Sequence, residues 1–131
     1  MPMLQLKVSP PQDARRRTLL AQRITALTHE TLGKRVPVTA LVIEDLPKDR
    51  WFIGAEPPPE AAAWLEISIT QGTNTNDEKQ AFVERTWQEL AQQLGPLAEA
   101  SYVIVREVPA TDWGFGGMTQ EARKKSRTPA L

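Results

Sequence analysis

The sequence contains one internal repeat, and this feature restricts the possible folds more than any other. Residues 2–9 (PMLQLKVS) align with residues 63–70 (AWLEISIT), and in both stretches apolar and polar side chains alternate. Residues 45–55 (DLPKDRWFIGA) align with residues 107–117 (EVPATDWGFGG). Three identities fall in register in that second pair: Pro47 with Pro109, Trp51 with Trp113, and Gly54 with Gly116. Alternation of period two is typical of a half-buried strand, so each copy is expected to open on a strand.

Each copy is also expected to contain a helix and then a second strand. The spacing i, i+4, i+7, i+11 places two sets of side chains on single helical stripes: Leu20, Ile24, Leu27 and Thr31, and Val83, Trp87, Leu90 and Leu94. Residues 75–78 (TNDE) have the form of a capping box at the start of the second helix. The second strands are expected over 38–45 and 101–108. The repeat therefore predicts an α+β fold of tandem β-α-β units, with a four-stranded sheet, two helices on one face and a pseudo-two-fold axis.

The chain of 131 residues is long enough for one domain with a sizeable core. We expect this domain to cover residues 1–118, with the two repeats at 2–54 and 63–117. Between them, residues 55–62 form a connector with three consecutive prolines, which is a stiff composition that builds no core. Residues 119–131 are expected to be a basic C-terminal tail.

The composition excludes several classes of function. Sixteen basic and sixteen acidic residues cancel, so no overall field attracts nucleic acid or a membrane surface. The chain has no cysteine and a single histidine, His29, which argues against a metal site and against thiol chemistry. No cofactor is expected. Because no apolar run approaches the roughly 20 residues that span a bilayer, and no export leader is visible, we expect a cytoplasmic protein.

Pro2 directly follows the initiator methionine, and a methionine before such a small residue is commonly removed. Removal would leave Pro2 as a free secondary amine at the end of a strand. An α-amino group has a reference pKa of about 7.7–8.0, and burial in an apolar pocket lowers it. The neutral amine can then remove a proton from a carbon next to a carbonyl group. The plainer interpretation is that Pro2 only begins a strand, where proline costs no ladder hydrogen bond.

The proline behind methionine, the β-α-β repeat and the Trp-x-x-Gly endings together resemble the tautomerase superfamily over about residues 2–117. Its founding members, the 4-oxalocrotonate tautomerases, are about one repeat long. This chain is similar to the fused two-unit form, as in the cis-3-chloroacrylic acid dehalogenase-like members. The resemblance implies a homotrimer of fused chains that acts on a small carbonyl or enol substrate, with Pro2 as the catalytic group. Ala63 matches Pro2 in the second unit, and its internal amide cannot be a base.

The resemblance also assigns substrate-binding positions, and here the sequence departs from the family. Family arginines that bind a substrate carboxylate match Thr70 and Thr73, which supply no charge. A second arginine position matches Ala40 and Tyr102. Arg106 remains a candidate cation, although a salt bridge within the sheet explains it equally well. The substrate is therefore expected to be less anionic than those of the family.

Two further residues match family site positions. Trp113 matches the aromatic side chain that packs against the substrate and is expected beside Pro2 if the two halves complete each other's sites. His29 matches a histidine of the cis-3-chloroacrylic acid dehalogenase-like members, and it lies off the apolar helical stripe. A core tryptophan and an ordinary surface histidine are the alternatives.

Three functions remain open from the sequence. The first is a tautomerase or isomerase that uses Pro2 as general base. The second is a non-catalytic or weakly active trimer that keeps the scaffold and has lost the arginine clamp. The third is a dehalogenase or hydratase of a small unsaturated acid, which would need a held carboxylate and an activated water.

Overall fold

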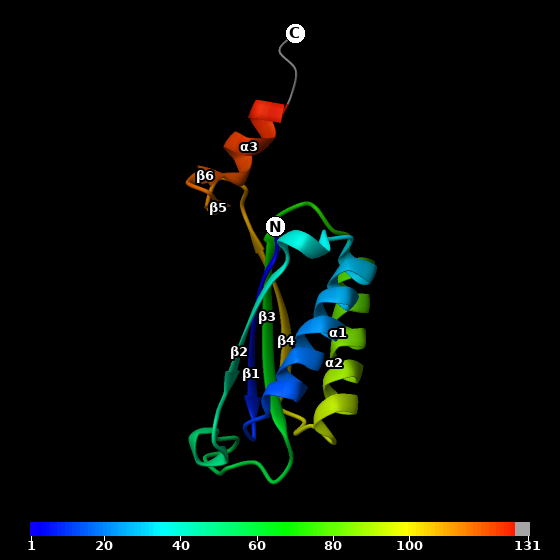
Figure 1. The fold of residues 1–131 in the computed structure, drawn as a ribbon, viewed down its shortest axis with the longest axis vertical. Helices are drawn as coiled ribbons and strands as arrows, with labels where there is room; N and C mark the ends of the chain where they lie inside the picture. Colours follow the sequence, from blue (N-terminus) through cyan, green and yellow to red (C-terminus); the bar gives the residue numbers. More distant parts are fainter. Residues whose placement is uncertain (128–131) are drawn as a thin grey trace.

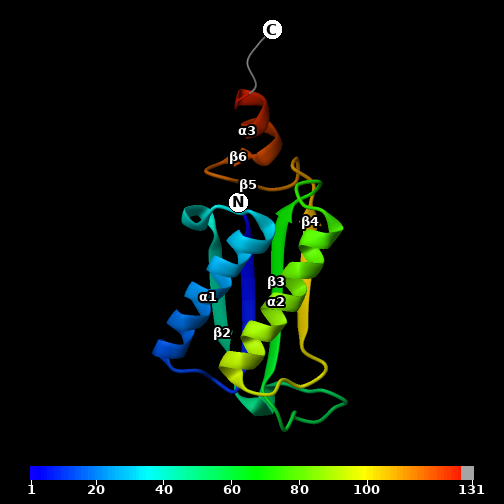
Figure 2. The same ribbon diagram turned by 90° about the vertical axis from the view of Figure 1, so that its right-hand side faces the viewer.

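Two β-α-β units build one four-stranded mixed sheet in the computed structural model, which describes residues 1–127. The first unit comprises β1 (Met3–Ser9), α1 (Ala14–Leu32), a 3-10 turn η1 (Val36–Val38) and β2 (Ala40–Asp45), followed by a second 3-10 turn η2 (Lys48–Arg50). The second unit comprises β3 (Ala62–Thr70), α2 (Asn76–Leu94) and β4 (Tyr102–Val108). Both helices lie on the same face of the sheet (Figures 1 and 2).

The strand pairing follows a pseudo-two-fold axis between the units. The sheet has the order β2-β1-β3-β4, in which β1–β2 and β3–β4 are parallel and the central β1–β3 pair is antiparallel. Leu4 pairs with Ile67 and Leu6 pairs with Leu65, so equivalent residues of the two copies exchange places across the axis. The predicted fold class is confirmed.

The core lies between the sheet and the two helices. It consists mainly of these fully or almost fully buried side chains: Leu4, Leu6, Val8, Leu20, Ile24, Leu27, Leu65, Ile67, Ile69, Phe82 and Leu90. Alternate residues of β1 and β3 face the helices, as the period of two predicts. The opposite face, which includes Gln5, Lys7, Trp64 and Glu66, is not covered by any element of residues 1–127 (Figure 1).

The buried stripe of α2 differs from the predicted one. Phe82, Thr86, Leu90 and Gln93 are buried, whereas Val83 is 36% exposed and Trp87 is only half-buried. Two neighbouring stripes of α2 have apolar residues at helical spacing, so periodicity alone could not choose between them. Packing placed Phe82 in the core and left Val83 at the surface.

The ends of the helices set the site-bearing turns. Asp13 caps α1, and Thr75 with Glu78 forms the predicted capping box of α2. Gly33 ends α1 with a φ of 68°, a left-handed conformation that favours glycine, and its backbone N–H donates to the carbonyl of His29. The chain therefore leaves α1 sharply, and Lys34 is the first residue of the turn.

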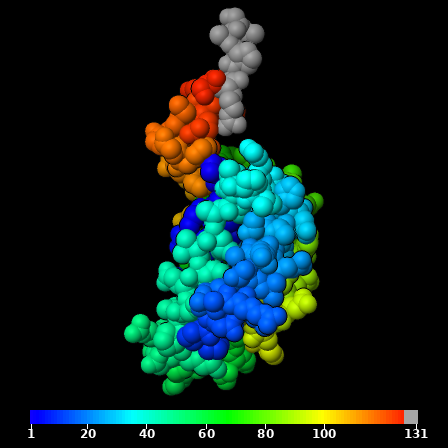
Figure 3. All heavy atoms as spheres, viewed as in Figure 1, coloured from blue at the N-terminus to red at the C-terminus, as the bar shows by residue number. Residues whose placement is uncertain are grey.

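The C-terminal segment projects beyond the end of the sheet at which the N-terminus lies (Figures 1 and 3). It contains a short hairpin, β5 (Gly114–Phe115) and β6 (Met118–Thr119), and then α3 (Gln120–Arg127). Gly114 is required in the hairpin because a Cβ there would lie 2.0 Å from the carbonyl oxygen of Met118. The expected basic tail thus includes a helix up to Arg127, and residues 128–131 lie outside the described part. No helix within residues 1–127 combines the length and the apolar character needed to cross a membrane.

Candidate active site

Pro2 lies at the start of β1 and is buried. Its carbonyl oxygen accepts a hydrogen bond from the backbone N–H of Ala40 at 3.2 Å, which fixes the backbone beside β2. A hollow of about 370 Å³, here called the Pro2 hollow, opens at this point. Besides Pro2 and Met1, its walls come from the turn after α1, with Lys34 and Arg35, and from the C-terminal hairpin, with Phe115.

A second hollow of about 640 Å³, here called the Thr73 hollow, adjoins the first. Both hollows share Met1, Lys34 and Gln120 in their linings. Thr70 and Thr73 line the Thr73 hollow because the end of β3 lies beside the start of β1 in the antiparallel pair. The structure therefore brings Pro2, Thr70 and Thr73 to one end of the sheet.

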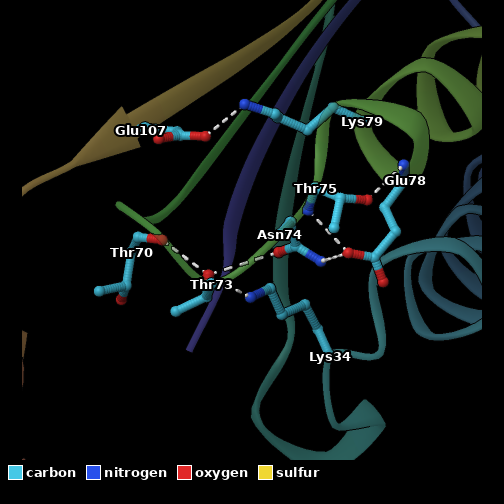
Figure 4. A network of polar contacts seen from close by, with 8 residues as sticks. All are labelled: Lys34, Thr70, Thr73, Asn74, Thr75, Glu78, Lys79 and Glu107. Carbon is cyan, nitrogen blue, oxygen red and sulfur yellow. Dashed lines mark hydrogen bonds and ion pairs between the residues drawn. The ribbon is translucent and has the colours of Figure 1, made fainter.

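Lys34 links the two hollows and is the one cation that lines both. Its Nζ donates a hydrogen bond to Thr73 Oγ1 at 2.9 Å, and Thr73 Oγ1 in turn donates to the carbonyl of Thr70 at 2.6 Å (Figure 4). Burial lowers the pKa of Lys34 below its ordinary value of 10.5, although the carboxylate of Glu78 opposes the shift. Because a hydroxyl group has one proton to donate, Thr73 orients Lys34 and keeps no donor for a substrate.

A polar network holds the turn between β3 and α2 in place (Figure 4). Asn74 Nδ2 donates to the carbonyl of Leu32 at 2.9 Å, which ties this turn to the end of α1. Glu78 accepts from the backbone N–H of Thr75 at 2.8 Å, and this bond is the main cause that lowers the pKa of Glu78. The network fixes the two turns that carry Lys34 and Thr73.

Lys79 and Glu107 tie the start of α2 to β4. Lys79 Nζ lies 2.5 Å from Glu107 Oε1, and this hydrogen-bonded ion pair lowers the pKa of Glu107 (Figure 4). The pair holds the β3–α2 turn from its other side. Both carboxylates, Glu78 and Glu107, therefore stabilise the β3–α2 turn, and neither lines one of the two hollows.

His29 lies in the last turn of α1 and is exposed. Its Nδ1 is 2.9 Å from the carbonyl oxygen of Lys34, and the histidine lines neither hollow. The geometry places His29 behind the turn that presents Lys34, where its ring holds the backbone.

Trp113 lies in the segment that precedes β5, and its carbonyl accepts from the backbone N–H of Gln120 at 3.0 Å. Within residues 1–127 its buried indole Nε1 has no hydrogen-bond partner. The aromatic ring that lines the Pro2 hollow is that of Phe115, two residues further along the chain. Arg123 stacks on Phe115, with its guanidinium carbon 3.7 Å from the ring centroid.

Tyr102 and Arg106 lie away from both hollows in the same chain. Tyr102 begins β4 at the opposite end of the sheet and is 57% exposed. Arg106 lies on the uncovered face of the sheet and forms an ion pair with Glu66. Neither side chain supplies a cation to the Pro2 hollow of its own chain.

The sequence analysis missed Lys34, Arg35 and Phe115, which all line the Pro2 hollow. The signal for Lys34 was present: a helix that returns from β1 to a parallel strand must end beside the start of β1, so the residues after Gly33 lie near Pro2. Phe115 lies two residues after Trp113 in the aligned Trp-x-x-Gly segment, and the family resemblance pointed to the tryptophan alone.

The equivalent position in the second unit cannot act as a base. Ala63 is fully buried, and its backbone N–H donates a hydrogen bond to Ser101 Oγ at 3.1 Å. Within residues 1–127, no group of three or more histidine, cysteine, aspartate or glutamate side chains is arranged to hold a metal ion.

Comparison with known proteins identifies the family. Residues 40–116 match the family model described as "Tautomerase enzyme". A search of the curated proteins gave no match. The solved structure described as "F6 fused 4-OT wild type asymmetric trimer" is 22% identical with a TM-score of 0.84, and the match covers 92% of this chain and 98% of that one.

Two other solved structures share the fold. "Crystal Structure of Native Fused 4-OT" is 23% identical with a TM-score of 0.83, covering 92% of this chain and 97% of that chain. The macrophage migration inhibitory factor-like protein of Entamoeba histolytica is 17% identical with a TM-score of 0.76, covering 90% and 97%. Because the family match extends over more than half of the sequence, this chain belongs to the tautomerase family.

Proposed function

We propose that this protein is a tautomerase, an isomerase in which Pro2 acts as general base on a small carbonyl or enol compound after Met1 is removed. One observation carries the proposal: Pro2 is buried at a hollow that is also lined by the partly desolvated cation Lys34. While Met1 is attached, the Pro2 nitrogen is an amide without useful basicity. Met1 lines both hollows, so its removal would also open the amine to a ligand.

The proposed reaction moves one proton within the substrate. The neutral Pro2 amine takes a proton from a carbon next to a carbonyl group, and the electron pair of the broken C–H bond moves to the carbonyl oxygen as an enolate. The protonated amine then returns that proton to another atom of the same molecule. Lys34 stabilises the enolate oxygen or holds a substrate carboxylate, and its partial burial strengthens this interaction relative to water.

The other candidate residues take supporting roles in this proposal. Thr73 and Thr70 orient Lys34, and His29 holds the turn that carries it. Phe115 forms the apolar wall that Trp113 is expected to support. Arg35 of the same chain also lines the Pro2 hollow. We propose that Tyr102 and Arg106 act at the Pro2 hollow of a neighbouring chain.

We propose that the chain is a single domain that assembles as a homotrimer. Its edge strands β2 and β4 are unpaired on their outer sides, and one face of the sheet is uncovered within residues 1–127. Such edges and faces usually become covered by association. The fused 4-OT structures that share this fold are described as trimers.

The alternative function is a non-catalytic or weakly active trimer. It is favoured by Thr70 and Thr73, which provide no charge where the family resemblance implies arginines. Lys34 weakens this alternative because it supplies a cation at the same place. A dehalogenase or hydratase remains the third possibility, and it requires in addition an activated water.

The test combines intact mass with activity. The mass of the protein from its native host should match the chain without Met1. That protein should catalyse the ketonisation of a phenylenolpyruvate-like enol, followed by ultraviolet absorbance. A matched control with one serine added before Pro2 keeps the fold and blocks the amine, so it should be inactive. Retention of Met1 in the native host, or equal activity of the blocked control, would overturn the proposal.

A further inference from the structure

Arg35 directly follows Lys34 in the turn that leaves α1, and both side chains line the Pro2 hollow. The backbone of Arg35 is held in place, because its carbonyl oxygen accepts hydrogen bonds from Thr39 Oγ1 at 2.7 Å and from the backbone N–H of Val38 at 3.3 Å. The 3-10 turn η1 that follows contains a proline, which restricts its backbone further. The turn therefore presents two consecutive cations to the hollow from a fixed backbone.

These two cations differ in how far the chain itself already satisfies them. Lys34 Nζ donates to Thr73, and the carboxylate of Glu78 acts on the charge of Lys34. Arg35 is exposed, and no carboxylate within residues 1–127 forms an ion pair with its guanidinium. A guanidinium has five N–H donors in a planar arrangement. Arg35 therefore keeps its whole donor set for a ligand.

The lining of the Pro2 hollow favours a ligand with one anionic end and one apolar end. Among residues 1–127, the charged side chains that line this hollow are Lys34 and Arg35, and both are cations. Val38 and Phe115 supply apolar walls. Because the proposed reaction takes place in this hollow, a substrate must reach it in the assembled protein too.

We infer that Arg35 is a substrate-binding residue that selects enols carrying a carboxylate beside the reacting carbon. The inference rests on the proposed tautomerase function and adds a substrate class to it. The planar guanidinium of Arg35 forms two parallel hydrogen bonds with the carboxylate, and Lys34 approaches the same end of the substrate from its more buried position. The apolar part of the substrate packs against Phe115.

The charge of that carboxylate does not change during the proposed reaction. Negative charge develops on the enolate oxygen instead. Arg35 should therefore bind the ground state and the transition state about equally, so its loss should raise KM and leave kcat nearly unchanged. A structural disturbance of the turn, which also carries Lys34, would lower kcat as well.

The kinetic test uses protein that lacks Met1, with phenylenolpyruvate and its ethyl ester as substrates. Arg35→Gln should lower kcat/KM for the acid about tenfold, through KM, and should leave the ester nearly unaffected. Arg35→Lys should give an intermediate loss, because an ammonium group keeps the charge without the two parallel bonds. Arg15→Gln is the matched control, since it removes the same group from an exposed position in the first turn of α1, and it should change neither substrate.

A binding measurement gives a second readout that does not depend on turnover. Cinnamate has a ring and a carboxylate but is not an enol, so the proposed reaction cannot consume it. In isothermal titration calorimetry, Arg35→Gln should weaken cinnamate binding about tenfold. Cinnamamide, which lacks the charge, should bind the parent and the variant equally. Thermal unfolding should confirm that both arginine variants fold.

The outcomes separate this inference from the proposed function. A parent protein that is inactive on both the acid and the ester would overturn the tautomerase proposal. An active parent in which Arg35→Gln affects acid and ester equally, lowers kcat, or has no more effect than Arg15→Gln would overturn the inference alone. A selective loss on the acid in Arg106→Gln, with none in Arg35→Gln, would also overturn it and would assign the carboxylate contact to the neighbouring chain.

Discussion

Lys34 Nζ donates a 2.9 Å hydrogen bond to Thr73 Oγ1 (Figure 4), and this contact joins the turn after α1 to the turn after β3. Lys34 also lines the Pro2 hollow. The two residues are 39 positions apart in the chain. Threonine at position 73 implied a site without a cation. The structure places an ammonium group next to that threonine, so a threonine at this position does not leave the hollow neutral.

Two replacements of Lys34 should distinguish the effect of its charge on activity from the effect of its size and shape. Lys34→Gln should lower kcat/KM for a carboxylated enol by roughly 10- to 100-fold, since a charge-assisted hydrogen bond is worth about 1.5–3 kcal/mol. Lys34→Arg keeps the charge and should retain most of the activity. Steady-state kinetics with a carboxylated enol and its ester give the comparison, and an equal loss on both substrates would assign Lys34 a structural role.

The dependence of activity on pH should also reflect the charge of Lys34. Activity should rise as the Pro2 amine loses its proton. It should fall again as Lys34 loses its own, and because burial lowers the pKa of Lys34 this fall comes below the ordinary 10.5. In Lys34→Arg the alkaline fall should disappear, because arginine stays charged. An alkaline limb that is the same in both proteins would contradict the assignment.

Pro2→Ala, in protein lacking Met1, keeps a free amine but loses the secondary amine and the rigid ring. General-base catalysis contributes about 10²–10⁴-fold, so kcat/KM on an enol should fall by a large part of that factor. Folding should persist, because the Pro2 carbonyl that bonds to Ala40 is retained. Circular dichroism and thermal unfolding provide the control, and parental activity would mean that Pro2 only begins a strand.

Small dicarboxylates should be poor substrates of the parent protein, because Thr70 and Thr73 supply no charge for a second carboxylate beside Lys34. Thr73→Arg should raise activity towards a dicarboxylate by about tenfold or more, given the worth of a charge-assisted bond. Thr18→Arg, an exposed position at the far end of α1, makes the same charge change as a control. A parent preference for dicarboxylates would show that a second cation binds the substrate, and Arg35 of the Pro2 hollow and Lys124 of the Thr73 hollow would be the first residues to replace.

Lowering the pH should reduce the free energy of unfolding, because it breaks the ion pair between Lys79 and Glu107 that holds the β3–α2 turn. The pKa of Glu107 is lowered in the folded protein by Lys79, so its ion pair contributes stability above the ordinary carboxyl pKa of 4.5. That contribution is lost as the pH falls through the folded-state value. Glu107→Gln should flatten the dependence of the unfolding free energy on pH in this acidic window, measured by urea titration. Glu99→Gln, in the exposed turn before β4, should leave the slope unchanged.

Sedimentation equilibrium should find a trimer at micromolar concentration and not the 14.6 kDa monomer. Val42, which is 50% exposed on the uncovered face of β2, should be covered in that assembly. Val42→Glu should therefore weaken association, because burying an unpaired charge is costly. Val83→Glu, at a 36% exposed site on α2, is the matched control and should leave the mass unchanged.

The sequence by itself determined the fold, because each local signal agreed with the others. Alternation in residues 2–9 and 63–70 predicted the two central strands, and the capping box at Thr75 placed the start of α2. Repetition of the unit implied the pseudo-two-fold sheet. The sequence also predicted an internal amide at the equivalent position of the second unit, since Ala63 aligns with Pro2.

Only the tertiary structure decided which side chains surround Pro2. Lys34 and Phe115 reach the Pro2 hollow from separate turns, and His29 supports a turn instead of lining a hollow. Periodicity likewise could not choose between Phe82 and Val83 for the core of α2. Local patterns depend on residues a few positions apart. A site depends on how the ends of distant elements pack, and that is set by the whole core.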